Sequence, residues 1–190
     1  MFIQTESTPN PMTLKFMPGE IVHPTGTAFY TNKEDAGASP LAQRLFDAGE
    51  VTAVFLSNDF ITVTKSPEVD WEDLKPALLT SIMDHYVAGL PVIEESKEAA
   101  PTPTPRGATS EEDQKIADQI VELLETRVRP AVAQDGGDII FHSFVDGVVH
   151  LEMHGACSGC PSSTATLKGG IENMLKHYVP EVVAVEAVGI

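Results

Sequence analysis

Cysteine is scarce in this chain, with two residues in 190. Small secreted domains that depend on disulfides are rich in cysteine, so the sequence does not belong to that class. Two thiols only three positions apart, in a reducing compartment, are more typical of metal ligands or of a redox pair. The cysteines are therefore the first candidates for function.

Basic residues are also few, since 12 Lys and Arg stand against 28 Asp and Glu, which gives a formal net charge of -16. A protein of this charge repels a phosphate backbone and releases no counterions from it. Nucleic acid is therefore a poor candidate ligand. We interpret the acidity as a source of solubility in preference to a specific basic partner.

Long hydrophobic runs are absent, and no segment approaches the roughly 18 consecutive apolar residues that span a bilayer. The first residues, Met1–Glu6, have neither the basic and apolar regions of a signal peptide nor the arginine-rich character of a transit peptide. These features lead us to expect a cytoplasmic protein of a bacterium, with a mature protein of the mitochondrial matrix as the alternative. We expect no membrane partner.

The composition, 42% hydrophobic and 21% charged, is that of a globular protein. Between Glu94 and Thr109 the sequence EESKEAAPTPTPRGAT has no hydrophobic period and carries three alternating prolines. Such a segment forms a flexible, extended linker. We therefore predict a domain over 1–93, a linker over 94–109 and a second domain over 110–190.

The hydrophobic periodicity predicts an α+β fold in which each domain is a small sheet packed with helices. In the first domain we predict strands over 2–5, 14–17, 51–56 and 60–64, and helices over 40–48 and from residue 71 onward. The longer helix has an apolar stripe at Trp71, Leu74, Leu78, Ile82 and Tyr86.

In the second domain the predicted order is helix, strand, strand, helix, strand. Its second strand turns Val149, Leu151 and Met153 to one side, and the apolar face of its second helix ends at Tyr178. Its first helix follows a capping box at 109–112, reaches Arg129, and ends or kinks at Pro130. Its first two strands are 139–144 and a segment after the turn Asp146-Gly147. Its second helix begins at Pro161, and its last strand covers 182–188.

Cys157 and Cys160 lie in the segment GACSGCPSS, between the second strand and the second helix of this domain. Structural zinc sites and cubane iron–sulfur clusters take four ligands, so one chain supplies half a site. The missing ligands come from histidines, from a second copy of the chain, or from nowhere because the pair does redox chemistry. The residues alone leave these three alternatives open.

The small residues of this loop leave room for an inorganic cluster, and its position on an exposed connection before a helix favours thiolate. We expect the helix dipole to lower the pKa of Cys160, an effect that could extend to Cys157. Ser162 and Ser163 cap the helix or donate hydrogen bonds to a cluster. The two glycines inside the helix, Gly169 and Gly170, indicate either a close approach by another group or a bend.

Three histidines on the two hairpin strands, His142, His150 and His154, make a zinc site with the cysteines conceivable. Polar residues on the outer face of a half-buried strand give the same pattern, and we prefer that interpretation. The segment Asp135–Asp138, DGGD, lacks the continuation of a phosphate loop and the ligand series of a calcium loop. We interpret it as a turn.

The segment GACSGCPSSTATLKGGIENML, with QDGGDI upstream, resembles the C-terminal domain of NifU-like proteins, and FIQTESTPNPMTLKF resembles the N-terminal domain of Nfu proteins. The sequence departs from the family pattern after Pro11, where asparagine is common. The resemblance implies a non-enzymatic iron–sulfur cluster scaffold and carrier, in which Cys157 and Cys160 bind a [4Fe-4S] cluster shared by two subunits of a homodimer. It implies apo iron–sulfur proteins as recipients and an upstream assembly scaffold as donor.

Two alternatives use the same cysteines. The first is a dithiol–disulfide oxidoreductase, with Cys157 attacking and Cys160 resolving, although the aromatic residue that usually precedes such a motif is missing. The second is a zinc-bridged structural homodimer without a transfer role, because four thiolates from two chains also suit zinc.

Overall fold

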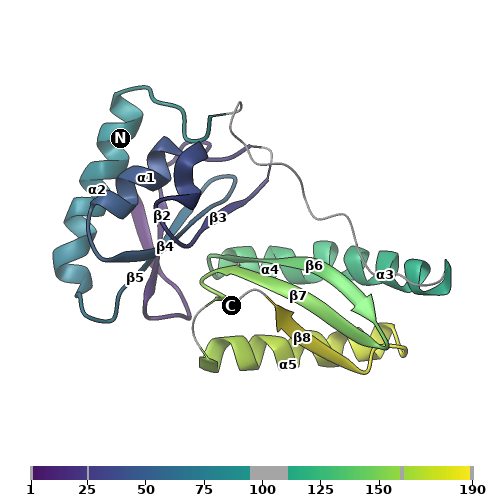
Figure 1. Ribbon diagram of the computed structural model, residues 1–190. Helices are drawn as coiled ribbons and strands as arrows, with labels where there is room; N and C mark the ends of the chain where they lie inside the picture. The colour runs from purple at the N-terminus through teal and green to yellow at the C-terminus, as the bar shows by residue number, and fades with distance from the viewer. Residues whose placement is uncertain (1, 25, 95–110, 159–160, 189–190) are drawn as a thin grey trace. The chain divides into compact units, whose positions relative to one another are not determined.

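The computed structural model describes residues 2–24, 26–94, 111–158 and 161–188, and of residues 111 and 161–163 it describes the backbone alone. The chain forms two compact units, 1–100 and 101–190 (Figure 1). Apart from its first residue, the predicted linker lies outside the described residues, as do the first two residues of the predicted capping box. Within the described ranges, no helix has the length and apolar character needed to cross a membrane.

The first unit is built on a five-stranded antiparallel sheet with the strand order β1-β2-β5-β4-β3. The strands are β1 Gln4–Ser7, β2 Thr13–Met17, β3 Ala28–Tyr30, β4 Val51–Leu56 and β5 Ile61–Lys65. The predicted hairpin of β4 and β5 is confirmed, and the Ser57 amide donates to the Phe60 carbonyl across its turn, at 3.0 Å. The short edge strand β3 carries no local signal strong enough to predict it.

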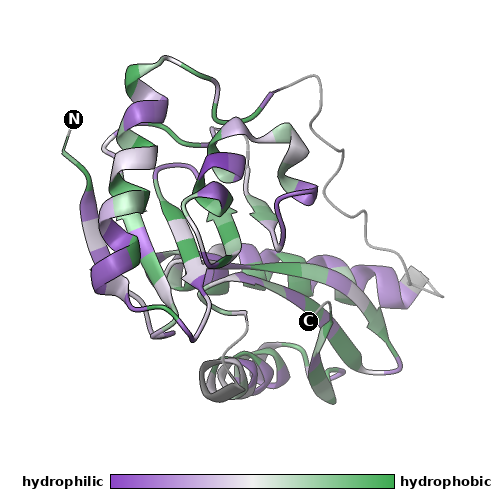
Figure 2. Ribbon diagram, turned by 60° about the vertical axis from the view of Figure 1, so that its left-hand side comes forward, coloured by the Kyte–Doolittle hydropathy of each residue, from purple (hydrophilic) through white to green (hydrophobic). Residues whose placement is uncertain are grey.

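Helices α1 (Pro40–Asp47) and α2 (Trp71–Val87), preceded by the 3-10 turn η1 (Asp35–Ala38), pack onto one face of this sheet. The predicted stripe of α2 is buried at Leu74, Leu78 and Ile82, and it meets the inward residues of β5, Ile61 and Val63. Figure 2 shows hydrophobic and hydrophilic residues alternating along these elements. The amphipathic pattern therefore selects the helix-covered face of the sheet.

The second unit begins with a long helical segment made of α3 (Glu111–Leu123), the π-helical turn η2 (Leu124–Val128) and α4 (Arg129–Gln134). Of the two outcomes predicted at Pro130, an end or a kink, the end is wrong, because the chain stays helical to Gln134. A proline ring clashes with the carbonyl four residues earlier and lacks an N–H. The wider π turn, in which the Arg129 amide donates to the Leu124 carbonyl, accommodates the proline without ending the helix.

Its sheet has the strand order β6-β7-β8, with β6 Gly137–Val145, β7 Val148–Gly155 and β8 Ala184–Val188. Strands β6 and β7 are antiparallel and turn at Asp146 and Gly147, both of which have positive φ, as predicted for this dipeptide. Helix α5 (Pro161–Tyr178) connects β7 to the parallel strand β8. The order helix, strand, strand, helix, strand is confirmed.

One core joins the helices of this unit to the inner face of its sheet. Val149, Leu151 and Met153 point into it, as predicted, together with Ile120 of α3 and Leu175 of α5. The predicted burial of Tyr178 is wrong, since this side chain is exposed at the end of α5. The α+β class predicted from the sequence is confirmed.

Candidate functional site

The cysteine loop connects the end of β7 to the start of α5. Cys157 is described, whereas Cys160 lies outside the described residues, and so do the side chains of Ser162 and Ser163. The geometry of the site is therefore built around Cys157 and the backbone that carries it. Its hydrogen-bonding partners come from β6 and α5.

Cys157 is buried, with 6% of its surface exposed, and it belongs to the apolar core of the second unit. The expectation that both cysteines lie on an exposed connection is wrong for this residue. The cause is Gly137 at the start of β6, against which the sulfur rests. A Cβ at position 137 would collide with the Cys157 Sγ and would lie 2.8 Å from the carbonyl oxygen of His154.

Backbone hydrogen bonds fix the entry to this loop. Gly137 pairs with Gly155 across β6 and β7, and the Ala156 amide donates to the Gly136 carbonyl at 3.1 Å. Gly136 has a φ of 81°, which a glycine adopts without strain. The DGGD segment is thus a turn at Asp135 and Gly136, as predicted, whereas Gly137 and Asp138 begin β6, and Gly137 forms the floor under Cys157.

The loop is fixed on its other side by α5. The Thr164 hydroxyl donates to the Cys157 carbonyl at 3.0 Å, and the Ser158 hydroxyl donates to the Gly155 carbonyl at 2.8 Å. These bonds tie Cys157 to both elements that flank the loop. Hydrogen bonds therefore hold the loop at Ala156, Cys157 and Ser158.

Burial raises the pKa of the Cys157 thiol to about 12, and the negative charges of Asp135 and Asp138 act in the same direction. A lowered pKa at Cys157, the extension that we considered from the helix dipole, is therefore wrong. The residue lies four positions before α5 begins, whereas the dipole acts within about one turn of the helix end. In this position the sulfur is a thiol at neutral pH.

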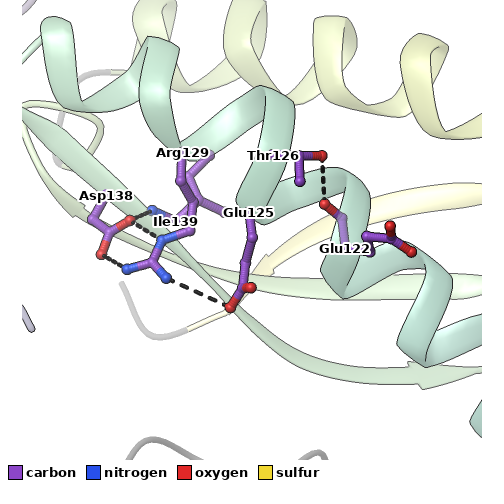
Figure 3. A network of polar contacts seen from close by, with 6 residues as sticks. All are labelled: Glu122, Glu125, Thr126, Arg129, Asp138 and Ile139. Carbon is purple, nitrogen blue, oxygen red and sulfur yellow. Dashed lines mark hydrogen bonds and ion pairs between the residues drawn. The ribbon is translucent and has the colours of Figure 1, made fainter.

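An ion pair beside the loop was not predicted from the sequence. Arg129 of α4 donates from Nε and Nη2 to the two carboxylate oxygens of Asp138, both at 2.8 Å, and Oδ1 also accepts the Ile139 amide (Figure 3). Asp138 is only 4% exposed. The bidentate pair holds the start of β6 against α4, and it raises the pKa of Arg129 chiefly through the hydrogen bonds to Asp138.

The histidines do not join the cysteine site. His150 lies 3.2 Å from the Ser143 hydroxyl, and His154 lies 2.9 Å from Glu152, both on the face of the sheet opposite the core. Among the described residues, no three side chains of His, Cys, Asp or Glu are grouped as metal ligands. His142 is exposed and His150 is partly exposed, as expected for outer-face residues, whereas His154 is buried, with 9% of its surface exposed.

The two cysteines of one chain suit an iron–sulfur cluster, but they supply only part of its ligands. The sequence places a second thiol, Cys160, three residues after Cys157, and thiolates are the usual ligands of such clusters. The described part of the chain offers no third ligand near them. A cluster of four ligands at this loop would therefore need two donors besides these two thiols.

The chain is similar to curated proteins along almost its whole length. It is 52% identical over 188 residues to NifU-like protein 4, mitochondrial, of Arabidopsis thaliana, covering 98% of this chain and 65% of that protein. It is 50% identical over 190 residues to the human NFU1 iron-sulfur cluster scaffold homolog, mitochondrial, covering 99% and 72%. The chain thus spans about two thirds of the length of these relatives.

These relatives correct the expected location. Their names place them in mitochondria, so the expectation of a bacterial cytoplasm is wrong. Within that expectation, the preference for a bacterium depended on the composition of residues 1–6. Such a short segment does not distinguish a bacterial protein from the mature part of an imported one.

A solved structure of a NifU-like protein from Saccharomyces cerevisiae aligns with a TM-score of 0.46 at 25% identity, over 50% of this chain and 86% of that one. Residues 3–89 match the family described as "Scaffold protein Nfu/NifU N terminal", and residues 120–186 match the "NifU-like domain". The second match contains the DGGD turn and the cysteine loop. The chain therefore belongs to the Nfu/NifU scaffold protein family.

Proposed function

We propose that this protein is a non-enzymatic carrier of a [4Fe-4S] cluster, which two copies of the chain hold between them. Cys157 and Cys160 of each copy are the proposed ligands, and they complete an all-cysteine site of four thiolates. The observation that supports this proposal is the half-site itself. A NifU-like domain presents two thiols on one loop, and the described residues near them supply no other ligand.

A cluster shared in this way is suited to transfer. Each chain contributes two of the four bonds, so separation of the copies, or exchange with the thiols of an acceptor, frees the cluster without unfolding either chain. Four cysteines of one chain would hold it more firmly. We therefore propose that the bound form is a homodimer that delivers its cluster to apo iron–sulfur proteins.

The remaining parts of the chain have their own place in this proposal. We propose that the division at 1–93, 94–109 and 110–190 lets the cluster domain reorient, and that the first domain helps to choose donors and recipients. An upstream assembly scaffold is the proposed donor. The mitochondrial names of the relatives support a mitochondrial setting.

The oxidoreductase alternative is disfavoured by the geometry of Cys157. An attacking cysteine needs an accessible thiolate, whereas this sulfur is buried and its pKa is raised to about 12. The zinc-bridged dimer uses the same four thiolates and is separated from the carrier by metal content. Zinc binds vacant thiolates readily, so the analysis needs protein that is isolated without air.

The test is anaerobic reconstitution of the full chain, followed by iron, sulfide and mass measurement on one sample. We expect about four irons and four sulfides per dimer, with thiolate-to-iron absorption. Cys157→Ala and Cys160→Ala should each lose the cluster and the dimer, while Gly170→Ala, whose new methyl meets no described atom within 4 Å, should keep both. A full cluster on either cysteine variant would refute the proposal. One zinc per dimer, in protein that takes up no iron during reconstitution, would refute it as well.

A further inference from the structure

The position of Cys157 conflicts with the position that a shared ligand must take. Its sulfur lies in the core of its own unit, among side chains such as Ile139 and Met153, and 6% of the residue is exposed. A ligand that bridges to a second chain has to reach the surface of its own. The sulfur therefore has to leave the observed position before it can serve a shared site.

The observed position depends on the absence of a side chain at residue 137. Gly137 leaves the space that the Cys157 Sγ fills, and an added Cβ there would also lie 3.1 Å from the Cys157 amide nitrogen. By contrast, Gly169 and Gly170 of α5 have no described atom within 4 Å of an added Cβ. Gly137 is thus a requirement of the inward position, whereas the other two glycines are not required by any described contact.

A second contact holds the backbone of Cys157 in the inward position. The Thr164 hydroxyl donates to the Cys157 carbonyl at 3.0 Å, and the neighbouring Ala156 amide donates to Gly136 at 3.1 Å. The backbone on both sides of the Cys157 Cα is therefore held while the side chain packs inward. Any displacement of this residue has to break the Thr164 bond or rotate the side chain out of the core.

We propose that Cys157 alternates between the inward position, held by Gly137 and Thr164, and an outward position in which it binds a ligand. This inference rests on the proposed function and deepens it. The inward position competes with the cluster for the sulfur, which weakens binding and favours release. On release the iron–sulfur bond to Cys157 breaks, the thiolate takes a proton from water as it turns inward, and an acceptor thiol loses one as it binds iron, so no electrons are transferred.

The test is the alkylation rate of Cys157 in the metal-free, full-length Cys160→Ser chain, in which Cys157 is the only thiol. Iodoacetamide modification, followed by intact mass, should be at least about 100-fold slower in the folded chain than in the same chain unfolded in guanidinium. Gly137→Ala should raise the folded-state rate at least about tenfold, because the new methyl excludes the sulfur. Gly170→Ala on the same background should leave it unchanged.

A second variant keeps the test valid if Gly137→Ala does not fold. Thr164→Val removes the hydrogen bond and keeps the shape, so it should raise the rate, while Thr164→Ser should restore the original one. Equal rates in the folded and unfolded chains would overturn the inference, and so would a folded Gly137→Ala chain that reacts at the original rate. Because these rates are measured without metal, they are independent of reconstitution: a wild-type chain that binds no cluster refutes the proposed function, even where Cys157 is protected.

Discussion

The sulfur of Cys157 occupies the space in which a side chain at position 137 would begin, so Gly137 and Cys157 form a matched pair across 20 positions of sequence. One is the first residue of β6 and the other belongs to the loop after β7. The contact joins the DGGD segment to the cysteine loop, and no other sequence pattern indicates that these two segments meet. The first consequence of the contact concerns the stability of the second unit.

Gly137→Ala should destabilise the second unit by about 1–3 kcal/mol, since the methyl group overpacks a site bounded by a sulfur and by the backbone of His154. Urea unfolding followed by circular dichroism measures the loss. The only tryptophan, Trp71, lies in the first unit, so its fluorescence should show an unchanged transition. Gly170→Ala is the matched control and should stabilise α5 by up to about 1 kcal/mol. Equal stabilities for the two variants would contradict the packing argument.

Arg129→Met should lower the unfolding free energy of the same unit by about 3 kcal/mol, because it removes the guanidinium that balances the charge of the buried Asp138 carboxylate. The partial exposure of Arg129 places the effect at the lower end of the range for buried pairs. Glu125→Gln is the control, since Glu125 is exposed and lies 3.9 Å from the same guanidinium (Figure 3). It should cost less than about 0.5 kcal/mol. Chemical denaturation distinguishes the two, and indistinguishable variants would show that the pair is not structural.

The elements of the second unit follow from local patterns, and the details of its site do not. The alternation of Val149, Leu151 and Met153 predicts a half-buried strand, and Asp146-Gly147 predicts its turn. Spacing also finds the two cysteines as the candidate ligands. The direction of the Cys157 sulfur depends on its contact with Gly137, a residue 20 positions earlier in the sequence.

The ion pair of Arg129 and Asp138 was missed for a related reason. Its partners are nine residues apart and are joined by a helix, a turn and the start of a strand. For the floor under Cys157, by contrast, the sequence does carry a signal in the two glycines before Asp138. Glycine indicates a close approach of backbone as well as a turn, and the prediction used only the turn.

Ser39→Ala should lower the unfolding free energy of the first unit by about 1–2 kcal/mol. Its oxygen accepts the Ala42 amide at 3.1 Å as the N-cap of α1 and donates to the Val92 carbonyl at 2.7 Å, so the change removes two hydrogen bonds. Trp71 fluorescence during urea unfolding reports the loss. Thr80→Ala, which removes an exposed hydroxyl within α2, should change the stability much less. A larger effect at Thr80 would show that the cap contributes little.

His85 gives the first unit a dependence on pH. The side chain is 0% exposed near the end of α2, and its pKa lies below the ordinary value of 6.5 because of burial and then the positive charge of Arg44. Backbone groups of Pro91 and Leu90 oppose this shift in part. Protonation of this imidazole therefore disfavours the folded state.

The sign follows from proton uptake. Well above pH 6.5 the imidazole is neutral in both states, and as the pH falls through 6.5 the unfolded chain binds a proton first. The unfolding free energy of the first unit should therefore fall with pH, at most by about 1.4 kcal/mol per unit from this group. Urea unfolding followed by Trp71 fluorescence, from about pH 7.5 to about pH 5.5, measures this slope. His85→Gln should flatten it, whereas His177→Gln, an exposed histidine of the second unit, should not; parallel slopes for wild type and His85→Gln would exclude His85 as the cause.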